Sequence, residues 1–371
     1  MVYGLDNTSF MPGNGTESAL EQRYNDLHIV IETYIKPIIY TIGIPGNLLS
    51  CIVWLQPRLR NSSACYFASL AFCEMAVLLL HTITSLQFVY HIPILTNQIS
   101  CDVFNTLFIV TESLCVLIVL GLTVDRYIIV CHPMKRITLC SIKRAMLVIL
   151  GLVILASLFG LAEGFFWTYD ASSESCVLRV HLTSSNKFPL STIGNIIILL
   201  STIILPTVAI CVLTVILLVF ISRRNKQRLV LAPSQCRAQR ESTMMILLVA
   251  IYVVISEIPE SIIYLLSPFY PHGNQTIVGH DRDLDENWQT HYNFRTINIL
   301  IETFSLTNYA INLLIYSLIG KQFRTTMLHC LFHGKRHNYN SSFYSAIQLQ
   351  PICHHNDSAS DVQVEGVNTI T

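Results

Sequence analysis

Six glutamates stand inside long apolar stretches of this sequence, and they are the side chains best suited to do chemistry there. An ionisable group in an apolar segment of membrane-spanning length costs several kcal/mol, so each one is a functional candidate by default. Carboxylates gathered in one place attract a cation. The six are Glu74, Glu112, Glu163, Glu257, Glu260 and Glu302.

Two of these glutamates flank a proline. Glu257 and Glu260 are three residues apart, so on a helix they occupy neighbouring positions of one face. Pro259 removes a backbone hydrogen bond between them, and we expect it to kink the helix and to act as a hinge. Both carboxylates should lie in the outer half of their span.

Two further glutamates are expected at the same depth. Glu112 lies about three helical turns inside Cys101, and Glu302 lies in the outer half of the last apolar stretch. With the pair around Pro259 they predict an electronegative pocket that is open to the outside and binds a cationic ligand. The alternative is that some of them pair with Lys36, with Arg295 or with one another's protonated forms.

A second polar group is expected around Glu74, midway along its apolar stretch. Asn47 in the first stretch and Asn308 and Asn312 in the last could converge on this carboxyl group. One carboxylate and three amides could hold a sodium ion or ordered water, or could satisfy one another. Both interpretations stay open at this point.

Several function classes find no support in the residues. No HExxH, GxSxG, pair of intramembrane aspartates or glycine-rich phosphate loop occurs, so we expect no enzyme. The thirteen histidines show no metal-ligand spacing, and no metal is expected from them. The formal net charge is zero, whereas nucleic-acid binding needs a concentrated basic face.

Seven apolar stretches must position these groups. The chain is 52% hydrophobic and only 12% charged, with a mean hydropathy of +0.52, which is typical of a membrane protein. Stretches of about 20 apolar residues can cross a bilayer as helices. They cover residues 29–55, 64–90, 101–130, 143–167, 190–222, 241–268 and 295–319.

The distribution of lysine and arginine predicts the orientation. These residues concentrate after the first, third, fifth and seventh stretches, which places those segments in the cytoplasm and the N-terminus outside. The N-terminal segment carries no pattern of a cleaved signal peptide. Asn7 and Asn14 in the predicted outer tail, and Asn274 in the last outer loop, are glycosylation acceptors.

Two cysteines stand apart from the other ten. Only Cys101, at the outer end of the third stretch, and Cys176, after the fourth, lie at the predicted outer, oxidising side. They predict a disulfide between the start of the third span and the loop before the fifth. The alternative is two free thiols.

With these residues in place, the chain resembles the rhodopsin-like (class A) G-protein-coupled receptors over residues 29–330. The most specific match is Asp125-Arg126-Tyr127, followed by Cys131-His132-Pro133. The resemblance implies an all-α membrane protein, a seven-transmembrane helix bundle with a short amphipathic eighth helix. Further matches are Asn47, Glu74 in place of the usual aspartate, Cys101 with Cys176, Pro206, Pro259, and Asn312 to Tyr316 with Leu313 in place of proline.

The resemblance also assigns roles to individual residues. Asp125, Arg126, Tyr127, Pro259, Asn312 and Tyr316 are expected to serve activation and G-protein coupling. At rest Arg126 would be held by Asp125. No acidic residue nearer than Glu241 completes a lock to another helix, which suggests a weakly latched resting state; unliganded signalling no higher than background would contradict this.

Departures from the family pattern bear on the ligand. Phe108 occupies the site where amine receptors place an aspartate, which argues against an amine ligand, and Glu257 replaces a usual tryptophan. The strings EIPESI, DRYIIVCHPMK and QFRTT resemble invertebrate FMRFamide- and myosuppressin-type neuropeptide receptors. Ligands ending in Arg-Phe-amide would suit Glu112, Glu257, Glu260 and Glu302, since a guanidinium can pair with a carboxylate in a bidentate way.

The resemblance divides the chain into three parts. Residues 1–28 would form an extracellular glycosylated tail, 29–330 the receptor domain and 331–371 a disordered cytoplasmic tail. Cys330 is a candidate for palmitoylation, and serines of the tail are candidates for phosphorylation by a kinase and binding of arrestin. The chain would reside in the plasma membrane, in contact with lipids.

Two other classes remain. A proton-coupled transporter could also place glutamates at mid-membrane, and ligand-dependent G-protein activation without substrate flux would separate the two. A receptor-like protein that does not signal is the other, because two family residues are replaced at positions 257 and 313. Within the family, a peptide receptor of another subfamily is a further alternative.

Overall fold

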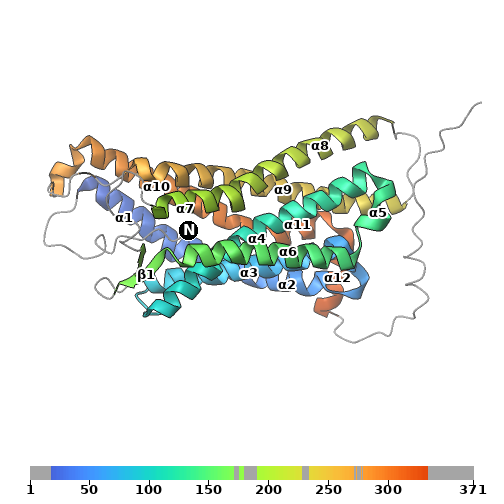
Figure 1. The fold of residues 1–371 in the computed structure, drawn as a ribbon, viewed down its shortest axis with the longest axis horizontal. Helices are drawn as coiled ribbons and strands as arrows, with labels where there is room; N and C mark the ends of the chain where they lie inside the picture. The colour runs from blue at the N-terminus through green and yellow to red at the C-terminus, as the bar shows by residue number, and fades with distance from the viewer. Residues whose placement is uncertain are drawn as a thin grey trace, which may run out of the picture. The chain divides into compact units, whose positions relative to one another are not determined.

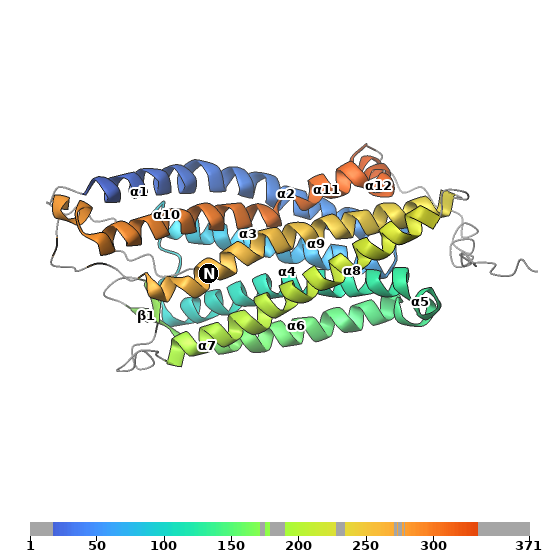
Figure 2. The same cartoon turned by 90° about the horizontal axis from the view of Figure 1, so that it is seen from above.

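The computed structural model describes residues 18–170, 175–178, 190–227, 234–270, 273, 277 and 279–332. In this part of the chain the dominant elements are long helices lying side by side (Figure 1). One end of the bundle carries the two short strands and is called the disulfide end below (Figures 1 and 2). The opposite end, with α5 (Pro133–Leu139) and α12 (Lys321–Phe332), is called the Asp125 end.

Seven spans form the bundle in the described part of the chain, with the bent helix pair at its end counted as one span, as the sequence predicts. The first joins α1 (Ala19–Val30), a π-helical turn (Ile31–Ile35) and α2 (Lys36–Trp54). The next three are α3 (Ser62–Phe88), α4 (Gln98–Cys131) and α6 (Ile142–Gly164). The fifth joins α7 (Leu190–Leu199), a π-helical turn (Leu200–Ile204) and α8 (Leu205–Gln227), and the sixth is α9 (Ser234–Leu266).

The seventh span is a broken helix. It consists of α10 (Glu286–Leu306) with a short 3₁₀ turn (Thr307–Tyr309), followed by α11 (Asn312–Ile319) at an angle of 47°. The bend occurs although Leu313 stands where the family carries proline. Asn47 compensates at the break, since its Nδ2 donates to the carbonyl of Tyr309 at 2.6 Å.

The middle of the bundle is α4, which contacts α3, α6, α8 and α9 (Figure 2). Its buried side chains, among them Ile118 and Leu122, belong to the main apolar core. Gly160 lets α6 approach closely, because a Cβ there would lie 2.7 Å from the carbonyl oxygen of Thr106. Close packing through small residues is common between membrane helices.

The outward faces of the spans are apolar, as contact with lipid requires. On α6 the buried positions are mostly small, such as Ala145, Ala156 and Gly160, whereas Leu150 and Leu158 are exposed. A water-soluble helix would show the opposite pattern. The chain is therefore a multi-pass membrane protein.

Two helices begin well before the apolar stretches from which their spans were predicted. Ser18 caps α1 by accepting from the amide of Glu21, and Asp285 caps α10 by accepting from that of Trp288. The first span is 36 residues long, about 54 Å, whereas a hydrocarbon core is about 30 Å thick. Hydropathy detects only the part inside the membrane, so the additional polar turns escaped the prediction.

Those additional turns pack against each other. Tyr24 of α1 lies beside Trp288 and Tyr292 of α10 in a small apolar cluster. Asp283, in a 3₁₀ turn (Gly279–Asp283), accepts from the amides of Ala19 and Leu20 at 2.9 and 3.0 Å. Arg282 pairs with Glu21 at 2.9 Å, so the first and seventh spans are joined beyond their apolar parts.

The predicted eighth helix is α12. It buries Phe323 and Thr326, exposes Leu328, Leu331 and Phe332, and is amphipathic in this sense. Cys330, the candidate for palmitoylation, is half-buried on it. Asn7, Asn14, Asn274 and the tail from residue 333 lie outside the described residues, so predictions about them stay predictions.

Candidate functional site

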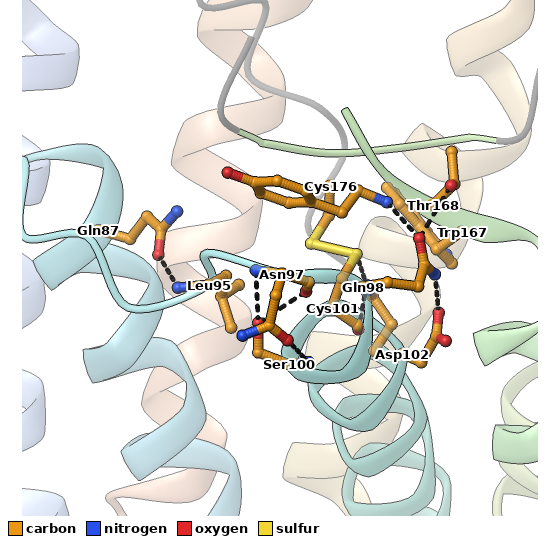
Figure 3. Close-up of a disulfide and its surroundings, with 12 residues drawn as sticks. Gln87, Leu95, Asn97, Gln98, Ser100, Cys101, Asp102, Trp167, Thr168 and Cys176 are labelled. Carbon is orange, nitrogen blue, oxygen red and sulfur yellow. Dashed lines mark hydrogen bonds between the residues drawn. A yellow bond between two sulfur atoms is a disulfide. The ribbon is translucent and has the colours of Figure 1, made fainter. Parts of the chain in front are cut away.

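The predicted disulfide is present at the end of the bundle that carries the strands. Cys101 of α4 is bonded to Cys176, with their Cα atoms 5.8 Å apart (Figure 3). Cys176 lies in β2 (Ser175–Leu178), which pairs antiparallel with β1 (Trp167–Asp170). The disulfide therefore ties this hairpin to the third span.

Polar side chains around the disulfide hold the hairpin at the start of α4. The Oε1 atom of Gln98 accepts from the amide of Tyr169 at 2.8 Å and from the Thr168 hydroxyl at 2.9 Å (Figure 3). Gln87 of α3 accepts from the amides of Ile94 and Leu95 and so orders the loop before α4. The hairpin and the start of α4, which are far apart in the sequence, thus meet here; the sequence had not predicted the hairpin.

Below this end, the structure brings three of the six glutamates together. Glu112 of α4 and Glu257 and Glu260 of α9 are close enough to interact electrostatically. Glu257 is only 4% exposed; its carboxyl group is hydrogen-bonded by Asn308, yet its Oε1 has no hydrogen-bond partner in the described part of the chain. This arrangement gathers three carboxyl groups between the third and sixth spans.

Two groups border the three glutamates. Nε2 of His81 lies 3.8 Å from Oε1 of Glu112, and its ring centroid lies 5.0 Å from that of Phe108. Phe108 is buried and also contacts Phe104. An aromatic wall beside the carboxylates suits a ligand that is both cationic and aromatic.

The predicted fourth member, Glu302, has an internal partner. Its Oε1 lies 2.8 Å from Nζ of Lys36, and the same Nζ lies 2.5 Å from Oε1 of Glu32. The sequence had left pairing with Lys36 open as an alternative, but Glu32 was not predicted. The spacing of four residues between Glu32 and Lys36 was the signal that could have revealed it.

The remaining glutamate, Glu163, is placed elsewhere. It lies at the end of α6 and accepts from Nε1 of Trp167 at 3.1 Å. Pro259 lies inside α9, which continues through it without a break. The structure thus sets Glu163 apart from a central set of three glutamates, which the Lys36 group adjoins because Glu260 also interacts electrostatically with Glu302.

The polar group around Glu74 is only partly as expected. Asn312 donates from Nδ2 to Oε1 of Glu74, and Asn47 binds the backbone at the helix break. Asn308 is hydrogen-bonded to Glu257 instead. In the described part of the chain, Asn47 Oδ1, Glu74 Oε2 and Asn312 Oδ1 are buried oxygen atoms without a hydrogen-bond partner.

Tyr316 lies next to this group among aromatic rings. The centroids of Trp54, Phe67 and Phe323 lie 5.5, 5.0 and 5.5 Å from that of Tyr316. The four side chains are buried and join the first, second and seventh spans to α12. Apolar packing therefore holds Tyr316, whose hydroxyl has no hydrogen-bond partner among the described residues.

At the Asp125 end, Ser63 links Asp125 to Arg126, two residues that we expected to contact each other directly. Ser63 of α3 donates to Oδ2 of Asp125 at 2.9 Å and accepts from Nη2 of Arg126. Ser62 also donates to Asp125, at 3.1 Å. The two charged residues are thus connected through the second span.

Neighbouring residues complete this end. Tyr127 packs on His132, with ring centroids 5.5 Å apart. Cys140 donates from its thiol to the carbonyl of Asp125 at 3.8 Å. Burial, reinforced by the Asp125 carboxylate, raises the pKa of the Cys140 thiol to about 12, so at neutral pH the thiol stays protonated.

Comparison with known proteins identifies the family of the chain. The family described as 7 transmembrane receptor (rhodopsin family) matches residues 46–316. The chain is 24% identical to the FMRFamide receptor of Drosophila melanogaster over 80% of its length. It is 31% identical to the neuromedin-U receptor 1 of Homo sapiens over 39% of its length, and 26% identical to the pyrokinin-1 receptor of Drosophila melanogaster over 45%.

The chain is shorter than these relatives. The matched regions cover 52% of the FMRFamide receptor, 36% of the neuromedin-U receptor and 40% of the pyrokinin receptor. The chain thus spans about half the length of the first and less of the other two.

Proposed function

Because the chain belongs to the rhodopsin family of seven-transmembrane receptors, we propose that it binds an extracellular amidated peptide with a cationic, Arg-Phe-amide-like end and activates a heterotrimeric G protein. A member of this family is a receptor rather than an enzyme. The observation that carries the ligand proposal is the set of three glutamates between α4 and α9, bordered by Phe108.

The proposed ligand end matches this set in charge and shape. A guanidinium is planar and always charged, and it pairs with carboxylates in a bidentate way. Glu112, Glu257 and Glu260 supply the charge, and Phe108 supplies an aromatic surface for the neighbouring phenylalanine ring. The FMRFamide receptor of Drosophila melanogaster, named for a peptide of this kind, supports the assignment.

The disulfide end is proposed as the extracellular one. Loops rich in lysine and arginine lie at the Asp125 end, which would face the cytoplasm of a cell with this receptor in its plasma membrane. The hairpin fixed by Cys101–Cys176 would cover the ligand. Residues 1–28 would be the glycosylated tail and residues 331–371 the cytoplasmic tail for a kinase and arrestin.

The Asp125 end is proposed to bind the G protein. In the described conformation Arg126 is buried and bonded to Ser63, which would be the resting state. Agonist binding would favour a second conformation in which Arg126 is released, with Pro259 as the hinge and Asn312 and Tyr316 rearranging. The ligand shifts this equilibrium only by its difference in affinity for the two states.

A sodium ion near Glu74 is a further proposal. Glu74, Asn47 and Asn312 each have a buried oxygen atom without a hydrogen-bond partner among the described residues, and sodium is a hard cation that prefers oxygen ligands. Replacing NaCl by choline chloride should change agonist affinity in the wild type and not in Glu74→Gln. An equal change in both would reject this site.

The function is tested by G-protein activation in cells that express the chain. The panel should contain Phe-Met-Arg-Phe-amide, its analogue with neutral citrulline in place of arginine, neuromedin U and a pyrokinin. We expect a response to the arginine peptide that citrulline and Glu257→Gln each weaken at least tenfold. Glu163→Gln is the matched control, because Glu163 lies outside the set of three.

Each other outcome of that experiment is informative. A response to neuromedin U or pyrokinin alone would keep the receptor class and replace the ligand, as two relatives suggest. A response to the arginine peptide that Glu257→Gln, Glu260→Gln and Glu112→Gln all leave unchanged would reject the acidic site. Silence to every peptide, with normal surface expression, would favour a non-signalling protein or a transporter.

A further inference from the structure

We propose that Glu32 and Lys36 determine the charge that Glu302 presents, so that the three side chains together offer one negative charge to the guanidinium of a ligand. The inference deepens the proposed function, on which it rests, by adding specificity-determining residues from the first span. These two residues would act through Glu302 and would not touch the ligand themselves.

The contacts define a group of three charges, called the Lys36 triad. One ammonium lies between two carboxylates, 2.5 Å from Glu32 and 2.8 Å from Glu302. The other oxygen of Glu32, Oε2, accepts from the Ser85 hydroxyl at 3.3 Å, and Ser85 is in turn 3.2 Å from the Tyr40 hydroxyl. Glu32 is therefore held from both sides.

Counting the formal charges leaves the triad with an excess of one negative charge. A single lysine paired with Glu302 alone would give a neutral pair, with little attraction for a further cation. The second carboxylate, Glu32, restores the attraction without facing the ligand. Because the group is largely removed from water, the effect of this charge is less screened than at a surface.

Exposure identifies Glu302 as the member that can reach a ligand. Its side chain is 33% exposed, whereas those of Lys36 and Glu32 are 6% and 11% exposed. Only Oε1 of Glu302 contacts Lys36. The second oxygen, Oε2, accepts no hydrogen bond from the residues that the structure describes, so it is available to a guanidinium.

The triad borders the central set of three glutamates. Glu260 interacts electrostatically with both Glu302 and Glu257 and so connects the two groups. Beyond it, Oε1 of Glu257 is a deeply buried acceptor without a partner among the described residues. Lys36 already pairs with Glu32 and Glu302 and is not a partner of Glu257. The unpaired acceptor is an independent observation that indicates a cationic ligand.

The backbone is irregular at the same place. The π-helical turn Ile31–Ile35 includes Glu32 and ends next to Lys36, whose amide donates to the carbonyl of Ile31. Single π-helical turns inside α-helices are rare and frequently occur at functional sites. The position of this turn agrees with a role for the two residues beyond packing.

The test is binding of arginine amide to the purified full-length receptor in lipid nanodiscs, measured as a rise in the thermal unfolding midpoint with concentration. A ligand that binds the folded state raises its stability by RT ln(1 + c/Kd), where c is the free ligand concentration, so the dependence of the midpoint on concentration gives the affinity. Citrulline amide is the control probe, because it keeps the α-ammonium and replaces only the charged guanidinium by a neutral urea group. Glu21→Gln is the control variant, because it removes a carboxylate from the same span at a distance from Glu302.

We expect Glu302→Gln to abolish the rise and Glu32→Gln to weaken arginine amide binding about fivefold to tenfold, the effect of one partly screened charge. The double variant Glu32→Gln with Lys36→Met again has one net negative charge and should recover binding to within about twofold of the wild type. A purely structural role predicts that the double variant binds no better than Glu32→Gln.

The inference is overturned if the wild type shows no rise with arginine amide, if Glu32→Gln binds like the wild type, or if the double variant fails to recover. The outcome is separable from that of the proposed function. A charge-dependent rise with no G-protein response in cells would support the triad and reject the signalling proposal. Normal peptide signalling without this charge dependence would reject the triad alone.

Discussion

The contact between the first and seventh spans has two regions that satisfy their polar groups differently. Towards the disulfide end, charges meet opposite charges, as in Lys36 with Glu302 and Arg282 with Glu21. Deeper in the bundle, amides make single bonds: Asn47 of the first span donates to a carbonyl of the seventh, and Asn312 of the seventh donates to Glu74 of the neighbouring second span. Oxygen atoms there remain without partners among the described residues. The same two spans are thus joined tightly in one region and loosely in the other.

The difference indicates which region can rearrange. Separating the Lys36–Glu302 pair, whose ammonium is buried, is costly, whereas amides with unused acceptors can exchange partners at little cost. A receptor needs two conformations of similar free energy. We therefore expect the outer contact to stay fixed when the inner one, around Asn312 and Tyr316, changes.

The largest effect is expected from removing the cation of the outer region. Lys36→Met leaves Glu32 and Glu302 without the cation between them, which should destabilise the protein by about 3 kcal/mol. The thermal unfolding midpoint in nanodiscs measures this loss. Adding Glu32→Gln to Lys36→Met should recover part of the stability. If Lys36→Met alone were as stable as the wild type, the account of the outer region would be contradicted.

The next effect concerns the inner region. Asn312→Leu removes the donor of the Glu74 carboxyl group and should cost about 2 kcal/mol, because a buried acceptor is left unsatisfied. The loss is measured in the same way and compared with Asn312→Asp, which keeps an oxygen and lacks the donor. If Asn312→Leu destabilised more than Lys36→Met, the ranking of the two regions would be wrong.

A smaller effect is expected at the Asp125 end, where a neutral hydroxyl joins two charges. Ser63→Ala should weaken the resting contact by about 1 kcal/mol and raise unliganded G-protein activation about fivefold. Ser62→Ala is the control, since Ser62 contacts Asp125 only. Unchanged unliganded signalling in Ser63→Ala would show that this serine does not hold Arg126 at rest.

The smallest effect is expected beyond the apolar parts of the spans. Arg282→Gln removes the pair with Glu21 and the contact with the Trp288 ring, 4.5 Å away, and should cost about 0.5 kcal/mol. The loss should shrink as the salt concentration rises. A cost that does not depend on salt would mean that Arg282 acts through packing alone.

Much of the bundle was predictable because its determinants are local in sequence. Apolar stretches of sufficient length, the charges between them and two cysteines on one side were enough for the seven spans and the disulfide. The N-terminal ends of α1 and α10 could not be predicted in this way. Asp283 binds the first amides of α1 from a distant segment, and the additional turns pack on each other. Such contacts leave no trace in hydropathy.

The candidate site was predictable in its residue types and less so in its partners. Burial made each glutamate a candidate, and three of them do lie together. Which cation meets Glu302, and that Asn308 bonds Glu257 rather than Glu74, depends on how the spans are rotated. The sequence carries no signal for that rotation beyond the spacing of Glu32 and Lys36.

The long first span also offers a practical advantage for spectroscopy. Because α1 is bonded at its outermost turn to the 3₁₀ turn before α10 and packs on α10 through Tyr24, a fluorophore on an exposed position such as Gln22 would move with the seventh span. A second label at the end of α9 could then be followed against it by energy transfer. A change in that distance on adding ligand would directly report motion of the sixth span, before any G protein is present.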